Sequence, residues 1–282
     1  MKPFPTALAL ALAATAGLAA PAWAACPDDA TIDAFVADWQ AKTPSTALGA
    51  VDSMEDALCA QGKIVERLAA SLGPVVGHKA GLTSKATQER FGVGEPVRGV
   101  LLRDTLLDDG ATVPAGFGAR PLFEADLILV VASDAVNDAT TPAEALSHIS
   151  EIRPFIELPD LAVAKEVALD GKLITAINVA ARLGIVGEPV DVYPGVLEML
   201  AGMTVKVVDG EGTELASTPG SAVLGNPVES VLWLVRNGVK LKAGDMVSVG
   251  SIGPLLPPKP GMEVTVRYLG LPGDPEVSVA FE

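Results

Sequence analysis

The sequence predicts a β-rich α/β fold with helices at its N-terminal side. Two helical patterns come first, short apolar segments separated by turn residues follow, and strand patterns dominate the last third of the chain. Residues 123–131 form a nearly continuous apolar run, whose Val, Ile and Leu content is typical of a strand buried on both faces. Because no repeat or linker-like stretch divides the sequence, we expect residues 25–282 to form a single domain, helical over 25–74 and β-rich over 75–282.

Two helices are predicted before residue 75. The first, over residues 28–41, repeats apolar side chains at helical spacing: Ile32, Phe35, Val36 and Trp39. The second begins at Ser53, which forms a capping-box pattern with Asp56, and ends at Gly73-Pro74. Its predicted apolar face consists of Leu58, Val65, Leu68 and Leu72.

Short strands and one brief helix are predicted between residues 75 and 113. Lys79 lies between Gly77 and Gly81, a pattern that indicates a short strand whose backbone is closely approached by another group. Ser84 is suited to cap a helix that ends at Phe91-Gly92. Residues 97–113 are typical of short strands interrupted by a turn at 108–110.

The remaining elements follow the apolar segment 123–131. A capping box with Pro at the first helical position predicts a helix from Thr141 to about Ile152, followed by a strand over 155–158 that carries Glu157. We expect a strand over 172–177, a hairpin turn at 209–212 and a helix from 226–229 to 237–238. Strands are predicted at 246–250, 262–268 and 276–281.

Two acidic residues interrupt the apolar segment. Glu124 and Asp126 are two residues apart, so a strand directs both carboxylates to the same face. Like charges on one face of an apolar strand repel each other and lose hydration, and a divalent cation compensates for both effects. The alternative is a strand end at which these acids reach solvent or meet an arginine such as Arg120.

The first 24 residues are typical of an export signal. Lys2 supplies the positive start, residues 7–20 the apolar core and Ala22-Trp23-Ala24 the cleavage site, so we expect a periplasmic or secreted protein that begins near Ala25. Processing as a lipoprotein at Cys26 is the weaker alternative. Removal of 24 residues from 282 leaves 258, and the loss of Lys2 changes the net charge from −15 to −16. Such an acidic chain argues against nucleic acid and anionic membranes as partners.

Cys26 and Cys59 are the two cysteines of the chain. Both follow the predicted cleavage site, and in an oxidising compartment they are suited to form a disulfide between the N-terminus and the first helical region. Two free thiols are the alternative, and two cysteines are too few for a typical zinc site.

Several motifs occur together in a characteristic order. They are Gly77-His78-Lys79-Ala80-Gly81-Leu82-Thr83-Ser84, Gly99-Val100-Leu101-Leu102, Phe123-Glu124-Ala125-Asp126, Ile156-Glu157-Leu158-Pro159-Asp160, Asn178-Val179-Ala180, Gly225-Asn226-Pro227, Gly244-Asp245, Gly250-Ser251 and Lys259-Pro260-Gly261. In this order the chain resembles the 2-keto-4-pentenoate hydratases and 2-oxo-3-hexenedioate decarboxylases of the fumarylacetoacetate hydrolase superfamily. The resemblance implies a mixed, rolled β-sheet with flanking N-terminal helices.

The resemblance also implies a metal site. Glu124, Asp126 and Glu157 match its acidic ligands, which suit Mg²⁺ or Mn²⁺ and, as a further option, Ca²⁺. In the family the ion acts as a Lewis acid on a chelated 2-oxo acid. Lys79 matches the family lysine, and we interpret it, with the three acids, as catalytic. A solvated lysine is the alternative.

Six further residues are predicted to bind the small 2-oxo acid substrate: His78, Leu82, Thr83, Ser84, Asp160 and Asn178. Some positions differ from the family pattern. Asp126 stands where a Glu is usual, His78 where an aromatic residue is common, and Leu161-Ala162 where Ser-Arg usually follows the aspartate. A surface or strand-edge histidine is the alternative interpretation of His78.

The first hypothesis is a metal-dependent hydratase that adds water to a short unsaturated 2-oxo acid in aromatic catabolism. A 2-oxo acid decarboxylase or acylpyruvate hydrolase is the alternative within the superfamily. An exported carboxylate-binding protein without catalytic activity is the alternative outside the enzymes. The family resemblance also implies a homo-oligomer.

Overall fold

The computed structural model describes Met1 and residues 26–282, so the predicted signal segment with Lys2 and Ala22-Trp23-Ala24 lies outside the described residues. The helices are α1 (Asp29–Gln40), α2 (Met54–Leu72), α3 (Lys85–Phe91), α4 (Pro142–Leu146), α5 (Gly171–Ala176), α6 (Val196–Gly202) and α7 (Glu229–Arg236). Among these described helices, none is long and apolar enough to cross a membrane.

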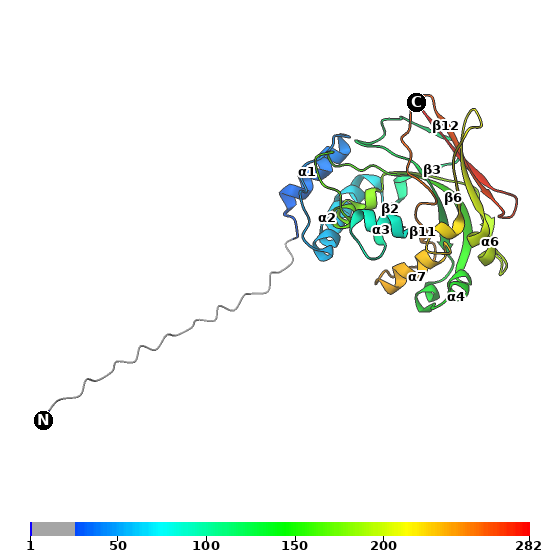
Figure 1. Cartoon of the computed structure of the whole chain (residues 1–282), viewed down its shortest axis with the longest axis horizontal. Helices are drawn as coiled ribbons and strands as arrows, with labels where there is room; N and C mark the ends of the chain where they lie inside the picture. Colours follow the sequence, from blue (N-terminus) through cyan, green and yellow to red (C-terminus); the bar gives the residue numbers. More distant parts are fainter. Residues whose placement is uncertain (2–25) are drawn as a thin grey trace.

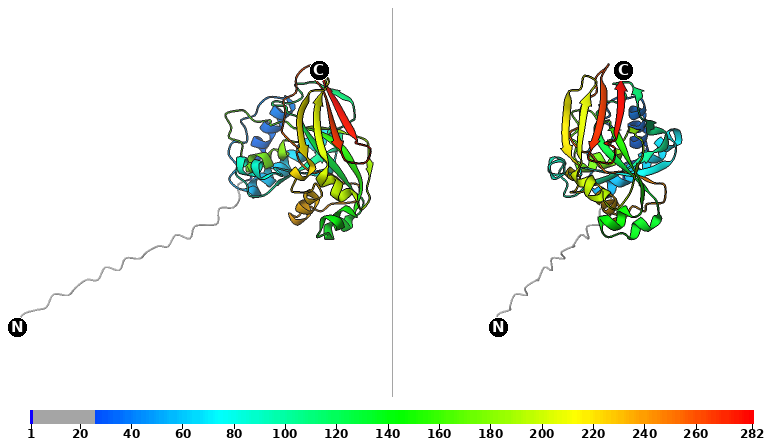
Figure 2. Two further views of the ribbon diagram at one scale, coloured as in Figure 1. Left: turned by 45° about the vertical axis from the view of Figure 1, so that its right-hand side comes forward. Right: turned by 90° about the vertical axis from the view of Figure 1, so that its right-hand side faces the viewer.

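Two mixed sheets form the centre of the fold. The larger has the order β2 (Val97–Leu102), β1 (Val75–Gly81), β11 (Met246–Ser248), β5 (Glu124–Val131), β6 (Ile149–Leu158), β7 (Leu183–Val186) and β3 (Leu106–Asp108), with β8 (Val190–Asp191) paired to β6. The smaller has the order β10 (Glu214–Pro219), β9 (Thr204–Asp209), β12 (Glu263–Leu269), β13 (Glu276–Phe281) and β4 (Ala111–Val113). Its yellow and red strands stand as a layer against the larger sheet in Figure 2. The predicted mixed, rolled sheet is confirmed.

The two faces of β5 have different partners. Ala125, Leu127, Leu129 and Val131 are buried in the main core together with residues of the smaller sheet. The opposite face carries Glu124, Asp126 and, further along, Ile128. Because side chains alternate along a strand, the apolar face fixes the register that directs both acids away from this core.

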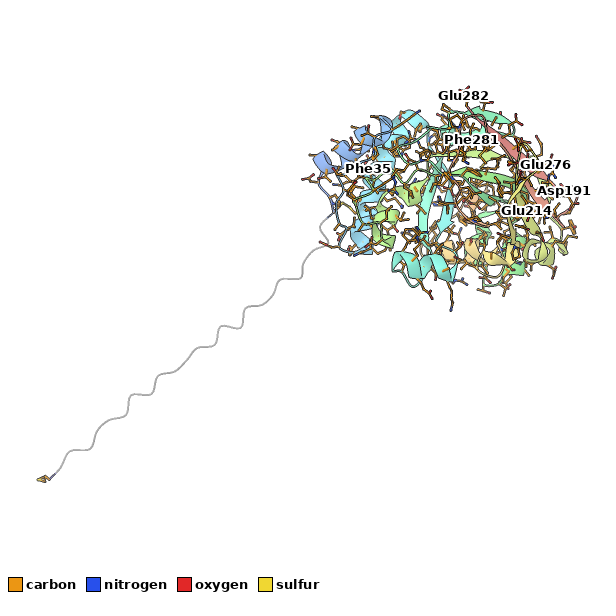
Figure 3. All side chains as sticks on the ribbon, turned by 45° about the horizontal axis from the view of Figure 1, so that its top comes forward. Phe35, Asp191, Glu214, Glu276, Phe281 and Glu282 are labelled. Atoms are coloured by element: carbon orange, nitrogen blue, oxygen red, sulfur yellow. A yellow bond between two sulfur atoms is a disulfide. The ribbon has the colours of Figure 1, made fainter. Side chains whose placement is uncertain are left out.

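A second core lies under the N-terminal helices. Buried residues of α1, α2, α5 and β2 form it, with Phe35 of α1 completely buried. Figure 1 shows α1 and α2 on the side of the molecule away from β12, and Figure 3 labels Phe35 there and Phe281 in the smaller sheet. A disulfide joins Cys26 to Cys59 of α2. The helical part is therefore tied to the sheet by apolar packing and to its own N-terminus by a covalent bond.

The structure corrects two predicted elements. The helix from Thr141 has the predicted capping box but ends at Leu146, because residues from Ile149 onward pair with β5. Residues 172–177 are not a strand: the Asp170 side chain accepts a hydrogen bond from the Leu173 amide and starts α5, which packs on α2. Cross-strand pairing in the first case, and a helix cap with tertiary packing in the second, outweigh local propensity.

The buried face of α2 also differs from the prediction. Its most buried positions are Asp56, Ala57, Ala60, Gln61, Ile64 and Leu68, whereas Leu58, Val65 and Leu72 are only partly buried. The polar Gln61 belongs to this face because its amide nitrogen donates to the carbonyl oxygens of Arg98 and Thr175, each at 2.7 Å. Two hydrogen bonds to backbone groups thus offset the cost of burying the amide.

Candidate functional site

Three carboxyl groups converge on one face of the larger sheet. Glu124 of β5 is the direct cross-strand partner of Glu157 of β6, and Asp126 lies two residues further along β5. One carboxylate oxygen from each residue lies within 4.8 Å of the others, and the three residues are only 7%, 0% and 2% exposed in the order Glu124, Asp126, Glu157. The interpretation of these acids as a solvent-facing strand end is therefore wrong.

Lys79 of β1 reaches the same place. Its Nζ donates to Glu157 Oε1 and, at 3.0 Å, to the carbonyl oxygen of Val179. Two strands, β11 and β5, separate β1 from β6, so a flat sheet would place them about 14 Å apart. A direct contact between the two side chains therefore requires the sheet to curl around the site. Because Lys79 is 2% exposed, it is not a solvated lysine.

Asp126 is held by hydrogen bonds from β11, from the residues just after it and from the smaller sheet. Its Oδ2 accepts from the Ser248 hydroxyl, and its Oδ1 accepts from the Gly250 amide at 3.0 Å. The Tyr268 hydroxyl, from the smaller sheet, donates to the Asp126 carbonyl oxygen. Sequence reasoning missed Ser248 and Tyr268, although the Gly250-Ser251 motif marks the end of β11. These bonds orient the Asp126 carboxylate before any ligand arrives.

Burial and mutual repulsion make the acids of this site reluctant to ionise together. Burial, and next the charge of Glu157, raise the pKa of Glu124 well above its usual range. The same two causes raise the pKa of Asp126 to about 7, although the hydrogen bond from Ser248 opposes the shift. A cation that binds here relieves this repulsion, so metal binding and deprotonation should be coupled.

The donor set fits a divalent cation. Three carboxylates offer the oxygen ligands that hard cations such as Mg²⁺ prefer. Glu157 Oε2 is buried and has no hydrogen-bond partner among the residues that the structure describes, which is costly for a carboxylate oxygen unless a further group binds it. Lys79 occupies only the other oxygen of that carboxylate. The three acids therefore fit a divalent-metal site, and Glu157 Oε2 is an oxygen that would be available to a bound ion.

A cavity of about 620 Å³ opens above these residues. Lys79 and Glu124 lie at its wall, and the predicted substrate-binding residues Leu82, Thr83 and Ser84 line it as well. The structure thus brings the predicted catalytic lysine, one predicted metal ligand and half of the predicted substrate-binding residues to one space.

The backbone around the cavity is strained. Leu82, Val179 and Ala180 line the cavity with positive φ angles of 54°, 53° and 58°. A β-branched residue such as Val179 rarely adopts this conformation, and such strain concentrates at functional sites. At Val179 the turn directs the carbonyl oxygen to Lys79 Nζ. Gly81 is required beside it, because a Cβ there would meet Val179 Cγ1 at 2.4 Å.

The other three predicted substrate-binding residues do not line this cavity. Asp160 accepts hydrogen bonds from the Ala119 and Arg120 amides and forms an ion pair with Arg182 at 2.9 Å. The Asn178 side chain bonds to the backbone of Val100 at 2.8 and 3.0 Å.

His78 neighbours Lys79 on β1, and alternation along the strand directs it to the opposite face. Burial lowers its pKa, while the charge of Asp245 opposes this shift. In the structure, Asp160 therefore holds the segment at Ala119-Arg120, Asn178 is bonded to strand β2, and His78 is not among the residues that line the cavity.

Sequence relatives are named as hydratases. A 2-keto-4-pentenoate hydratase of Dechloromonas aromatica is 33% identical over 205 residues, which cover 70% of this chain and 75% of the relative. The 2-keto-4-pentenoate hydratase of Paraburkholderia xenovorans is 29% identical over 216 residues, which cover 74% and 78%. No family model matches the chain.

Solved structures show the same fold. A 4-oxalocrotonate decarboxylase from Pseudomonas putida, complexed with magnesium and adipate, has a TM-score of 0.76 and 26% identity, and the match covers 90% of this chain and 96% of that one. A fumarylpyruvate hydrolase from Pseudomonas aeruginosa matches with a TM-score of 0.53 and 14% identity, over 72% and 88% of the two chains. The likeness to the decarboxylase therefore includes the helical part as well as the two sheets.

Proposed function

The chain belongs to the 2-keto-4-pentenoate hydratase family, and we propose that it is a divalent-metal-dependent hydratase of short unsaturated 2-oxo acids. The observation that supports this most strongly is the buried group of three acids beside Lys79, of which Glu124, together with Lys79, lines a cavity of about 620 Å³. Hydration of such a substrate requires an electrophilic centre for the 2-oxo acid and a group that moves protons.

Glu124, Asp126 and Glu157 would hold the ion, which supplies a Lewis acid for the carboxylate and keto oxygens of the substrate. Mg²⁺ or Mn²⁺ is the proposed ion, and Ca²⁺ is the further option. In support, solved structures of the 4-oxalocrotonate decarboxylase contain magnesium in one case and calcium in another. Asp126 has one methylene less than glutamate, but the bonds from Ser248 and Gly250 fix its carboxylate in place.

Lys79 is the proposed proton-transfer group. Adding water across a double bond requires a proton to reach carbon and another to leave the water. Lys79 Nζ lies at the cavity wall, and its bonds to Glu157 and to the Val179 carbonyl oxygen fix its position. We assign to Lys79 the holding and movement of a proton at Nζ, and to Leu82, Thr83 and Ser84 the lining of the substrate space.

Calorimetry and a turnover assay test this proposal. Mg²⁺ should bind to the protein, and pyruvate or oxalate should bind more tightly when Mg²⁺ is present. The loaded protein should hydrate 2-hydroxypenta-2,4-dienoate. Glu124→Gln should abolish Mg²⁺ binding, whereas the matched change at an exposed residue, Glu214→Gln, should not. Unchanged Mg²⁺ affinity in Glu124→Gln would rule out the assigned ligands.

Decarboxylation of a 2-oxo acid is the second candidate. It is favoured by the likeness to the 4-oxalocrotonate decarboxylase, which extends over 90% of this chain. Release of CO₂ from 2-oxo-3-hexenedioate without hydration of the dienoate would establish it, and cleavage of an acylpyruvate would indicate a hydrolase instead. Binding of Mg²⁺ and pyruvate without turnover of any of these compounds would identify a carboxylate-binding protein.

We also propose export of the chain, with removal of residues 1–24, to the periplasm or the medium. The disulfide between Cys26 and Cys59 supports an oxidising compartment. The N-terminal sequence of the purified native protein tests the cleavage site near Ala25. A homo-oligomer, a single domain over residues 25–282 and a role in aromatic catabolism are further proposals. Light scattering, limited proteolysis and growth on aromatic carbon sources, respectively, test them.

A further inference from the structure

We propose that the cavity contains a distal apolar subsite for the aliphatic tail of a 2-oxo acid longer than five carbons. This inference rests on the proposed function, since the tail is placed relative to the acids that would hold the ion and the 2-oxo group. The subsite, called the distal pocket, is formed by Leu82, Phe91, Leu122, Leu161, Ile174 and Leu255.

The distal pocket is assembled from separate segments of the chain. Leu82 precedes α3 and Phe91 ends it, Leu161 follows β6, and Ile174 lies on α5. Leu82, Phe91 and Leu161 pack against the core under the N-terminal helices, which supports their positions from behind. Binding to an apolar surface of this kind is favourable when apolar groups of the ligand cover it and displace water.

Three of the hydroxyl groups that line the cavity, those of Ser84, Thr87 and Ser251, are already engaged by the protein. Ser84 Oγ and Thr87 Oγ1 bond to each other at 3.0 Å, and Thr87 Oγ1 also donates to the Ser84 carbonyl oxygen at 2.8 Å. Ser251 Oγ donates to the carbonyl oxygen of Gly253, also at 2.8 Å. Beside these three residues, a polar tail would therefore compete with bonds that exist, whereas an apolar tail would not.

The size of the cavity exceeds the need of a five-carbon substrate. Even if each of its non-hydrogen atoms takes the volume of a water molecule, about 30 Å³, a five-carbon 2-oxo acid fills roughly 240 Å³. The cavity has about 620 Å³. The remaining space is sufficient for several further methylene groups.

Arg90 provides the competing interpretation. It lines the cavity, and its guanidinium lies over the Phe91 ring, 5.4 Å from the ring centroid. An arginine there is suited to a second carboxylate at the far end of a substrate. However, Arg90 is exposed, so solvent screens its charge, whereas the aliphatic side chains form a larger and partly buried surface. The apolar tail is therefore favoured.

A chain-length series measured by calorimetry tests the subsite. The Mg²⁺-loaded protein is titrated with pyruvate, 2-oxohexanoate, 2-oxooctanoate and 2-oxoadipate. Each buried methylene group should tighten binding by about fourfold, so 2-oxooctanoate, with five more of them, should bind roughly a thousandfold more tightly than pyruvate if all five are buried. Binding that does not change along the series, or a preference for 2-oxoadipate over 2-oxohexanoate, overturns the subsite. Failure of all four compounds to bind overturns the proposed function together with it.

Two variants locate the effect. Leu255, at the cavity mouth, is 41% exposed, so Leu255→Asn should fold normally. It should lower the ratio of 2-oxooctanoate to pyruvate affinity severalfold. Met199 of α6 is 38% exposed and does not line the cavity, so Met199→Asn is the matched control and should leave the ratio unchanged. Equal ratios in the wild type and in Leu255→Asn would overturn the assigned position of the tail.

Discussion

Metal-free protein should lose stability as the pH rises, and Asp126 should account for much of the loss. Its pKa is raised from 3.8 to about 7 in the folded state, mainly because it is buried and lies near the charge of Glu157. Between these two values the unfolded chain releases the proton while the folded chain retains it. The free energy of unfolding therefore falls from pH 3.8 upward and levels off above pH 7.

The size of the effect follows from the same shift. Each pKa unit corresponds to about 1.4 kcal/mol, so the full shift is worth about 4 kcal/mol, of which about 2 kcal/mol is lost between pH 5 and pH 7. Glu124 acts in the same direction, since its pKa is also raised. Mg²⁺ should oppose the loss, because it binds to the ionised carboxylates and stabilises the folded state more at higher pH.

Urea denaturation at pH 5 and pH 7 in the presence of EDTA measures this slope. Between pH 5 and pH 7, the fall in unfolding free energy should be smaller by about 2 kcal/mol in Asp126→Asn than in the wild type. Asp191→Asn is the matched control, because Asp191 is exposed, and it should keep the wild-type slope. If Asp126→Asn and the wild type lose the same free energy between the two pH values, the reasoning about the buried carboxyl group is refuted.

Three further substitutions test separate parts of the structure. Lys79→Met should lower kcat by a factor of about 100 or more while Mg²⁺ still binds, as shown by calorimetry and turnover; near-normal kcat would contradict the role of Lys79. Replacing Cys26 and Cys59 by serine opens a loop with a sequence separation of 33 residues and should lower unfolding free energy by about 3–4 kcal/mol in urea titrations. Gly81→Ala should cost about 1–3 kcal/mol, since its Cβ has no room, whereas Gly62→Ala on α2, which has open space, should be neutral or stabilising.

The elements of the fold were predictable where local rules and tertiary packing agree. The Ser53 cap and Gly73 bound α2 as predicted, and the apolar segment with Glu124 and Asp126 forms the buried strand β5. Prediction failed where local rules and tertiary packing disagree. Ile174 and its β-branched neighbours favour a strand, yet Asp170 caps a helix there and α2 covers it. The local strand propensity of these residues carries no information about their packing against α2.

The site was predictable in its residue types but not in its assembly. Alternation along the strand places Glu124 and Asp126 on one face, as the sequence indicates. The contact between Lys79 and Glu157 spans 78 positions and depends on the curl of the sheet, for which the sequence contains no local pattern. From the sequence, only the family resemblance predicted that these residues belong to the same site.

The same resemblance did not indicate which predicted residues line the cavity and which have side chains already bonded within the protein. Asp160 and Asn178 stand in motifs, and their side chains are polar, but both are engaged by backbone groups of the protein itself. The hydroxyl of Ser248 and the ring of Tyr268 reach the site from β11 and from the smaller sheet, so they could be found only after the strand order was known.

The central claim is that Glu124, Asp126 and Glu157 together bind a divalent cation on which a 2-oxo acid is held. A crystal soaked with Mn²⁺ and oxalate, with an anomalous difference map recorded for manganese, tests this claim most directly. We predict one strong peak in contact with a carboxylate oxygen of each residue, with oxalate bound to it on the cavity side. A manganese peak elsewhere, or none at the three acids while Lys79 keeps its pair with Glu157, would contradict the claim.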